Sequence, residues 1–228
     1  MPYVVLTVLL LALAWAPSLW VRSRMRRHGA ERPDLPGTGG ELAVHLLRRF
    51  GLDDVTVERT DALRDHYDPN ARAVRLGPAN FDGRSLTAVA VAAHEVGHAI
   101  QFGRDEPVSR LRRKWLPVSH RATRAGIVLL MAMPVIGLIA RSPAAIVAVV
   151  VLSLALQLVG VLARAIVLPE EWDASFGKAL PVLAEGGYLD AADLPAVREV
   201  LKAAALTYVA RALADLVNVG RWALILRR

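Results

Sequence analysis

The sequence predicts a mainly α-helical, membrane-anchored protein with a small β-hairpin upstream of an H-E-x-x-H helix. Three observations support this fold class. Hydrophobic residues make up 54% of the 228 residues and the mean hydropathy is +0.37, which is high for a soluble domain. Three uncharged runs approach or reach the length that crosses a bilayer. The stretch "VAVAAHEVGHAIQFG", residues 89–103, carries two histidines four positions apart.

The net charge and the lack of cysteine limit the classes of protein. The chain has 28 Lys and Arg against 21 Asp and Glu, a formal charge of +7. Its basic residues crowd beside apolar runs and are not interleaved with aromatic residues, which favours a lipid bilayer over nucleic acid as the partner. The absence of cysteine excludes disulfides and thiolate zinc ligands, and it agrees with a reducing, cytosol-facing site.

The uncharged runs predict about three transmembrane helices. The first run, residues 1–21, predicts a retained N-terminal anchor. A signal peptide is the alternative, but no basic segment precedes the run, and Pro17 makes a poor cleavage context after "AWA". The other two runs, 125–140 and 142–163, are separated only by Arg141 and predict a transmembrane hairpin with a minimal turn. A buried hydrophobic hairpin of a soluble protein is the alternative.

The region between the anchor and the hairpin has the patterns of a soluble fold. A short amphipathic helix is predicted over about 39–50, and a strand with period-two alternation is predicted in "VTVER", 55–59. A turn at "DPNA", 68–71, precedes a second strand in "AVRL", 73–76. These elements predict a small β-hairpin just upstream of the histidine pair.

The histidine pair lies in a stretch, 86–102, that lacks proline and reads as one continuous helix. Positions i and i+4 share a helix face, so His94 and His98 could bind one ion in the manner of a zincin-like H-E-x-x-H helix. Glu95 would lie beside the ligands without coordinating. Gly97 is a poor helix former, which indicates the close approach of another segment at that face. Two buried, hydrogen-bonded histidines are the alternative reading.

A third ligand is expected in the sequence that follows the predicted hairpin. A catalytic zinc site has three protein ligands and one open position. The stretch "LPEEWDASFGKAL" offers Glu170, Glu171 and Asp173. Two membrane spans return the chain to the side that it left, so these carboxylates face the same compartment as the histidines. Acidic residues after Pro169 also suit the first turn of a helix, and this structural role is the alternative for each of them.

Taken together, these sequences resemble the YugP-like neutral zinc metallopeptidases, a family of membrane-bound bacterial proteins. The resemblance covers nearly the whole chain and rests on "RDHYDP" (64–69), "VRL" (74–76), "VAAHEVGHAIQ" (91–101), "LP-E-DAS" (168–175) and "VLKAAALTYVARAL" (200–213). It implies a zinc-dependent metallopeptidase with one Zn²⁺ per chain. The implied substrate is a peptide or protein, and the implied location is the bacterial plasma membrane.

A more distant resemblance to the membrane heat-shock and CAAX-processing metallopeptidases implies which carboxylate binds the zinc. Their third ligand is a glutamate that begins a helix after membrane spans, which corresponds to Glu171. Those proteins carry an aspartate four residues later, where this chain has Ser175. Asp173 is the candidate for that supporting carboxylate.

The implied reaction is hydrolysis of a peptide bond, with zinc on His94, His98 and Glu171 and with Glu95 as the general base. The candidates for stabilising the oxyanion are Tyr208, His66 and Tyr67. The "AVRL" strand is expected to bind an extended substrate by β-augmentation. The alternative function is a non-catalytic, zinc-stabilised membrane scaffold or adaptor, which would tend to have a fourth protein ligand and would not need Glu95.

Four parts of the chain are expected. They are an N-terminal anchor (1–21), a cytosol-facing metallopeptidase region (22–124), a transmembrane hairpin (125–168) and a helical region with the third ligand and a C-terminal amphipathic helix (169–228). Basic residues crowd at both ends of the second part, and Lys and Arg are retained on the cytoplasmic side. The charge pattern therefore predicts a multi-pass protein with its N-terminus outside and its active site facing the cytoplasm. A fourth span is the alternative for the C-terminal helix.

Overall fold

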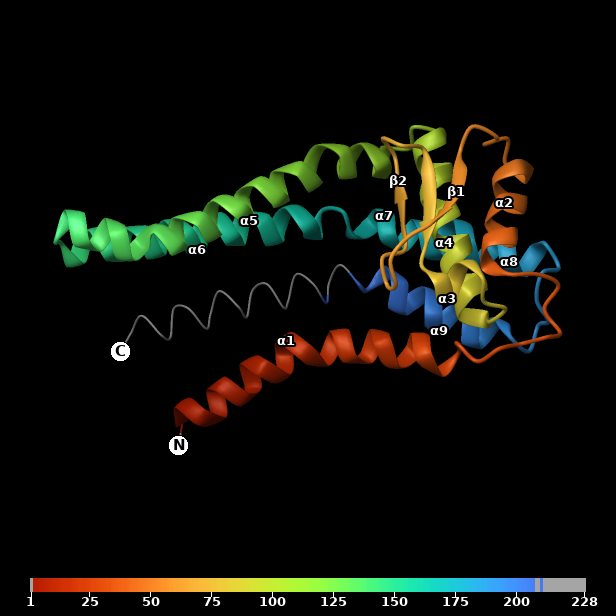
Figure 1. Cartoon of the computed structure of the whole chain (residues 1–228), viewed down its shortest axis with the longest axis horizontal. Coiled ribbons are helices and arrows are strands. Elements are labelled where there is room, and N and C mark those ends of the chain that lie inside the picture. The colour runs from red at the N-terminus through yellow and green to blue at the C-terminus, as the bar shows by residue number, and fades with distance from the viewer. Residues whose placement is uncertain (1, 208–209, 211–228) are drawn as a thin grey trace. The chain divides into compact units, whose positions relative to one another are not determined.

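The computed structural model describes residues 2–207 and residue 210, which are mainly helical (Figure 1). They divide into two compact units, one formed mainly by Leu111–Val167 and the other by Leu19–Arg110 with Leu168–Thr207. The elements are α1 (Pro2–Arg27), α2 (Gly39–Arg49), β1 (Thr56–Arg59), β2 (His66–Asp68), β3 (Ala73–Leu76), α3 (Pro78–Phe81), α4 (Leu86–Gly103), α5 (Pro107–Ala140), α6 (Pro143–Ala165), α7 (Leu168–Trp172), the π-helix η1 (Asp173–Ala179), α8 (Leu180–Glu185) and α9 (Leu194–Ala205).

The first unit contains a helical hairpin of α5 and α6, which run side by side in Figure 1. Only Arg141 and Ser142 separate the two helices. Arg141 adopts a left-handed backbone conformation, with a φ of 47°, and its N–H donates to the carbonyl oxygen of Gly137 at 3.0 Å. This tight reversal agrees with the minimal turn that the sequence predicts.

Small and hydroxyl-bearing residues line the seam between α5 and α6. The Ser119 hydroxyl donates to the Gly160 carbonyl oxygen at 2.7 Å, and the Ser153 hydroxyl donates to the Gly126 carbonyl oxygen at 2.6 Å. Both acceptors are glycines, whose lack of a side chain lets the two backbones approach closely. Close backbone packing at small residues is typical of helices that associate inside a bilayer.

The outer faces of α5 and α6 are apolar and exposed. Both helices are long and apolar enough to cross a membrane. Their exposed large apolar side chains include Ile127, Val128, Met131, Val135, Leu138, Ile139, Val147 and Val151. A core helix of a soluble protein would bury such side chains, so this surface fits contact with lipid. A third span over residues 1–21 stays a prediction, although residues 2–21 are helical as part of α1.

The second unit is built around α4, which is buried along nearly its whole length and packs against α2, α9 and η1. The Ser85 hydroxyl caps this helix by accepting a hydrogen bond from the Ala88 N–H at 3.1 Å. The helix predicted over about 39–50 is α2, which begins with a capping box between Thr38 and Glu41. The H-E-x-x-H sequence thus lies at the centre of this unit's core.

The β-sheet differs from the predicted hairpin. Its strand order is β1-β3-β2, with β1 parallel and β2 antiparallel to β3. The predicted turn does join two antiparallel strands, but the first of them is β2 rather than the "VTVER" strand. The prediction that β3 binds substrate along a free edge is wrong, because β3 is hydrogen-bonded on both sides.

Candidate metal centre

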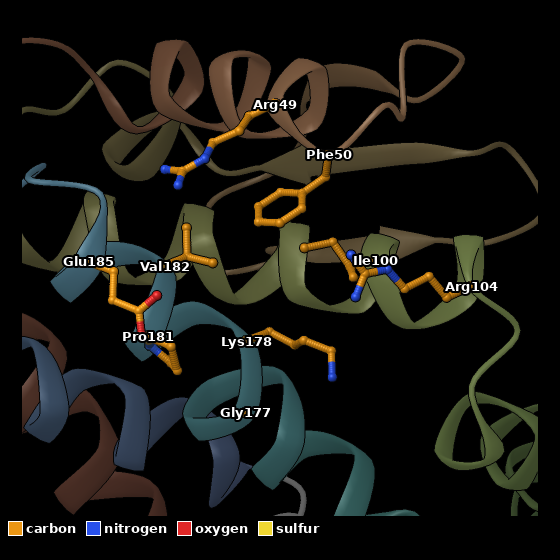
Figure 2. A pocket seen from close by; sticks show the side chains of 9 residues that line it. All are labelled: Arg49, Phe50, Ile100, Arg104, Gly177, Lys178, Pro181, Val182 and Glu185. Atoms are coloured by element: carbon orange, nitrogen blue, oxygen red, sulfur yellow. The ribbon is translucent and has the colours of Figure 1, made fainter.

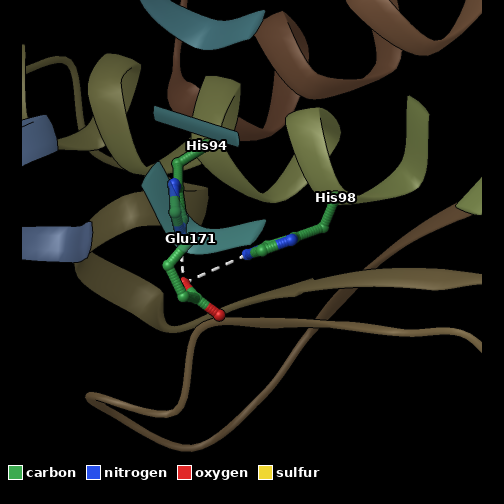
Figure 3. A group of neighbouring side chains, drawn as sticks. All are labelled: His94, His98 and Glu171. Atoms are coloured by element: carbon green, nitrogen blue, oxygen red, sulfur yellow. Dashed lines mark ion pairs between the residues drawn. The ribbon is translucent and has the colours of Figure 1, made fainter. Parts of the chain in front are cut away.

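Helices α4 and α7 bring His94, His98 and Glu171 together in the second unit. One carboxylate oxygen of Glu171, Oε2, lies 3.4 Å from His94 Nε2 and 3.3 Å from His98 Nε2, as the dashed lines in Figure 3 mark. All three side chains are buried, with Glu171 only 1% exposed. Three potential ligand atoms therefore converge on one point inside the protein.

The spacing of these atoms fits a small metal ion. All three lie within 4.8 Å of one another. Zinc bonds of about 2.0–2.2 Å in tetrahedral geometry separate neighbouring ligand atoms by about 3.4 Å. The measured separations of 3.3 and 3.4 Å between Glu171 Oε2 and the two Nε2 atoms agree with that value. Two imidazole nitrogens and one carboxylate oxygen also form a donor set that zinc prefers.

The electrostatics of the cluster favour a positive charge at this point. Burial alone would lower the pKa of His98, but the charge of Glu171 and hydrogen bonds to Glu170 and Glu171 outweigh it and raise the pKa to about 10. Burial would raise the pKa of Glu171, whereas the nearby charge of His98 and hydrogen bonds to both histidines hold it well below its usual range. The buried carboxylate of Glu171 therefore favours a positive charge beside it.

Glu95 is another buried ionisable side chain near these three residues. It is 7% exposed, and burial raises its pKa, with Glu171 and Asp65 adding to the rise and the two histidines opposing it. A carboxylate with a raised pKa is a better proton acceptor near neutral pH than an exposed one. Glu95 therefore has the environment of a general base.

Gly97 permits the close packing that brings η1 against α4. A Cβ atom at this position would lie 2.7 Å from the carbonyl oxygen of Ala174, which is closer than two such atoms can approach. The predicted close approach at this glycine is therefore present, and the approaching segment is the backbone of η1. The contact positions the neighbouring Ser175 beside the ring of His94, with Oγ and Nδ1 3.0 Å apart.

The two other acidic candidates for the third ligand lie in different places. Glu170 is also buried, but its Oε1 lies 3.4 Å from His98 Nδ1, the ring nitrogen that does not face Glu171. Asp173 accepts hydrogen bonds from the Gln101 amide at 2.8 Å and the Lys178 ammonium at 2.9 Å. Sequence reasoning assigned no role to Gln101, although its position three residues after His98 places it on the same helix face.

Two of the three candidates for stabilising the oxyanion, His66 and Tyr67, lie among the described residues. His66 lies on β2, where its Nδ1 is 2.7 Å from the carbonyl oxygen of Arg64. Tyr67 is a core residue, because its ring is 6% exposed and packs against Phe102 at a centroid distance of 5.6 Å. Tyr208 and most of the predicted C-terminal helix lie outside the described residues.

A pocket of about 240 Å³ lies on another side of α4 (Figure 2). Its walls come from α2, α4, η1 and α8, and they include the cationic side chains of Arg49, Arg104 and Lys178. Ile100, Phe50 and Val182 form its apolar part. Because these lining residues differ from the four that meet at the histidine pair, the pocket and the candidate metal centre are separate features.

The fold and the centre define a class of protein. Two helices are long and apolar enough to cross a membrane. In the second unit, an H-E-x-x-H helix and a second helix place three buried side chains where they could hold a metal ion. Residues 3–227 match the family described as "Putative neutral zinc metallopeptidase", and the chain therefore belongs to that family.

A curated relative supports the same assignment. The chain is 34% identical over 226 residues to the protein named "Putative membrane protease YugP" from Bacillus subtilis (strain 168). The alignment covers 99% of this chain and 96% of that protein. The comparison with solved structures gave no match. The resemblance read from the sequence is thereby confirmed at the level of the family.

Proposed function

We propose that this chain is a membrane-bound zinc metallopeptidase that hydrolyses peptide bonds at the candidate metal centre. The observation that carries this proposal is the convergence of His94, His98 and Glu171 on one point, with the buried carboxylate of Glu95 beside them. These three residues would hold one Zn²⁺ per chain, and Glu95 would act as the general base.

Glu95 takes part in both proton transfers of the proposed mechanism. When bound, zinc supplies Lewis-acid activation of the attacking water and polarisation of the scissile carbonyl. Glu95 accepts the proton of the attacking water and then donates it to the leaving amine, so that no proton has to come from bulk solvent. Burial serves this role, because it raises the pKa of Glu95.

Catalysis explains the composition of the site better than a scaffold does. A structural zinc site is normally closed by a fourth protein ligand and does not need a buried base. Here the trio of His94, His98 and Glu171 is accompanied by Glu95, whose ionised form is disfavoured by burial. Retaining a carboxylate in such an environment costs stability, and proton transfer gives a reason for it.

An edge of the sheet is the proposed binding place for an extended substrate. Strand β2 lies at one edge of the three described strands, and Asp65, which directly precedes it, is close enough to contribute to the pKa of Glu95. A peptide that pairs with the outer side of β2 would therefore run near the catalytic base. His66 lies on the same strand and remains, with Tyr208, a candidate for stabilising the oxyanion.

Metal dependence tests the proposed function on the purified full-length chain in detergent. We expect about one zinc per chain and hydrolysis of fluorescently labelled casein, an unstructured protein substrate. A chelator should abolish the hydrolysis and added zinc should restore it, because the ligands are buried and pre-arranged in the protein. A chain that holds one zinc but leaves casein intact would favour the scaffold, and a chain without zinc would contradict both functions.

The proposed orientation places the metal centre in the cytoplasm of a bacterial cell, with the hairpin turn outside. Lys and Arg near span ends are retained on the inner side. One group of basic residues follows the first apolar run, at Arg22, Arg24, Arg26, Arg27 and Arg32. A second group precedes the apolar part of α5, at Arg110, Arg112, Arg113, Lys114, Arg121 and Arg124. Apart from Arg141, no Lys or Arg separates the two apolar stretches of the hairpin.

Cysteine labelling tests this orientation without interference, since the chain has no cysteine of its own. An impermeant maleimide should leave Ala62→Cys, at an exposed position in the second unit, unlabelled in intact cells and should label it after permeabilisation. Ser142→Cys, in the hairpin turn, is the matched control and should react in intact cells. The reverse pattern at these two positions would show that the metal centre faces outward.

A further inference from the structure

The two ring nitrogens of each site histidine face different surroundings. The Nε2 atoms of His94 and His98 both face Glu171. The Nδ1 atoms face away from it, toward the Ser175 hydroxyl oxygen in one case and the Gln101 amide oxygen in the other, each at 3.0 Å. Which nitrogen carries the proton decides whether Nε2 can bind a metal, since a protonated nitrogen has no free lone pair.

The second hydrogen bond of Ser175 determines which ring nitrogen of His94 is protonated. The Ser175 hydroxyl donates its single proton to the carbonyl oxygen of Leu201 on α9, at 3.1 Å. A carbonyl oxygen can only accept, so this proton is not available to the histidine. The hydrogen bond between Ser175 and His94 must then be donated by the ring, from Nδ1–H to the hydroxyl oxygen. His94 is therefore protonated at Nδ1, which leaves the lone pair of Nε2 facing the metal position.

The other hydrogen bonds of Gln101 determine in the same way which ring nitrogen of His98 is protonated. The Gln101 amide nitrogen lies 3.0 Å from the carbonyl oxygen of Glu170 and 2.8 Å from a carboxylate oxygen of Asp173. Both atoms accept hydrogen bonds, so the NH₂ group must point toward them and the amide oxygen must point toward His98. That oxygen can only accept, which requires Nδ1–H on His98. Lys178 binds the same oxygen of Asp173 at 2.9 Å and holds the carboxylate in place.

We propose that Gln101 and Ser175 are positioning residues that hold a proton on Nδ1 of both histidines and so direct both Nε2 atoms at the metal position. The proposal rests on the proposed function, because it assigns the Nε2 atoms to zinc. Both residues are fully buried, at 0% exposed, so neither hydrogen bond competes with water. The two groups that contact the rings, the Ser175 hydroxyl and the Gln101 amide, are both uncharged. Ser175 is hydrogen-bonded in turn to Leu201 on α9, and Gln101 to Asp173 on η1. Outer partners of this kind orient ligands and raise their affinity for metal.

Zinc affinity measured by competition with a chromogenic chelator tests the proposal on the full-length protein in detergent. Gln101→Leu and Ser175→Ala should each weaken zinc binding by about 10- to 100-fold, because each removes the acceptor that lies nearest to Nδ1–H, at 3.0 Å in both cases. For His98 the carboxylate of Glu170 is the more distant neighbour of Nδ1, at 3.4 Å. The matched control is Thr87→Val on the same helix. Thr87 is buried and its hydroxyl donates to the Met25 carbonyl oxygen at 2.8 Å, two turns from the histidines, so its loss should leave zinc affinity unchanged.

Exchanging the amide of Gln101 and the carboxylate of Asp173 tests whether Gln101 positions His98 or only fills space. In Gln101→Glu with Asp173→Asn, a carboxylate oxygen accepts from His98 Nδ1–H, and the new amide at position 173 donates to that carboxylate. This double variant should bind zinc more tightly than Gln101→Leu, because it keeps an acceptor for His98 Nδ1–H. The hydrogen bond between positions 101 and 173 is reversed and the one to the Glu170 carbonyl oxygen is lost, so recovery of the full wild-type affinity is not required. Gln101→Leu should remain weak when it is combined with Asp173→Asn.

The outcomes distinguish this proposal from the proposed function. Wild-type protein that binds no zinc would contradict the proposed function itself. Wild-type protein that binds zinc, with Gln101→Leu and Ser175→Ala binding it equally well, would overturn the tautomer assignment alone. A double variant that binds zinc no more tightly than Gln101→Leu would also overturn it, since retaining the acceptor for Nδ1–H would then have no effect.

Discussion

Replacing Glu95 with glutamine is expected to lower the rate of peptide hydrolysis by about 10²–10⁴-fold, the usual contribution of a positioned general base. Glutamine has nearly the shape of glutamate but cannot accept a proton at neutral pH. Since the mechanism needs Glu95 for both proton transfers, the remaining rate would come only from activation of water and binding of substrate. Hydrolysis of labelled casein by the purified variant measures this effect.

The same variant should keep its zinc and its fold. Glu95 is not one of the three converging ligand groups, so about one zinc per chain is expected by metal analysis. Burial raises the pKa of this carboxyl group, which means that the folded protein disfavours the ionised form at neutral pH. A neutral glutamine removes that cost, and thermal unfolding of the variant should occur at or above the wild-type temperature. Casein hydrolysis at the wild-type rate would show that Glu95 is not the base.

The histidine pair could be predicted from the sequence because it depends only on local geometry. Helical spacing puts His94 and His98 on one face wherever the helix packs, and the lack of proline from 86 to 102 predicts the helix. The same reasoning predicts close packing at Gly97, since glycine costs helix stability without such a reason. Nothing local shows which segment approaches, and in the structure it is the backbone at Ala174.

The arrangement of the acidic cluster could not be predicted, because the chain forms a π-helix there. In η1 the wider turn brings Lys178 next to Asp173, five residues earlier, with a 2.9 Å ion pair. An α-helical reading would pair residues three or four apart instead. The sequence therefore did not show that Asp173 supports His98 through Gln101 rather than by direct contact. Ser175, expected only as a departure from distant relatives, contacts His94 directly.

The strand pairing was also beyond the sequence, because β2 is only three residues long. So short a strand shows no alternation. The longer "VTVER" segment does alternate, and the pattern therefore predicts that segment as the partner of β3. Cross-strand contacts explain the observed order. Arg75 on the central strand forms ion pairs with Glu58 on β1 at 2.9 Å and with Asp68 on β2 at 2.6 Å. One cation on the central strand thus pairs with an acidic side chain on each outer strand.

Glu171 and Glu170 form a matched pair for identifying the third ligand. They are adjacent in the chain, are both carboxylates and are both 1% exposed. They differ in the side of the His98 ring that they face. Glu171 lies 3.3 Å from Nε2, which also faces the metal position, whereas Glu170 lies 3.4 Å from Nδ1 on the opposite side. A single ion can therefore bind Glu171 together with both histidines.

We expect Glu171→Gln to weaken zinc binding by more than about 100-fold, because it removes a charged ligand directly. Losing a residue that only hydrogen-bonds a ligand typically costs up to about 100-fold. Glu170→Gln should stay within about 10-fold of the wild-type affinity, since it alters only a contact on the far side of the ring. Chelator competition measures both, and casein hydrolysis should follow zinc occupancy in each variant. Loss of zinc in Glu170→Gln with retention in Glu171→Gln would reverse the assignment. Equal loss in both would indicate that the two carboxylates act on the metal together, which the separation of Nδ1 and Nε2 across one imidazole ring argues against.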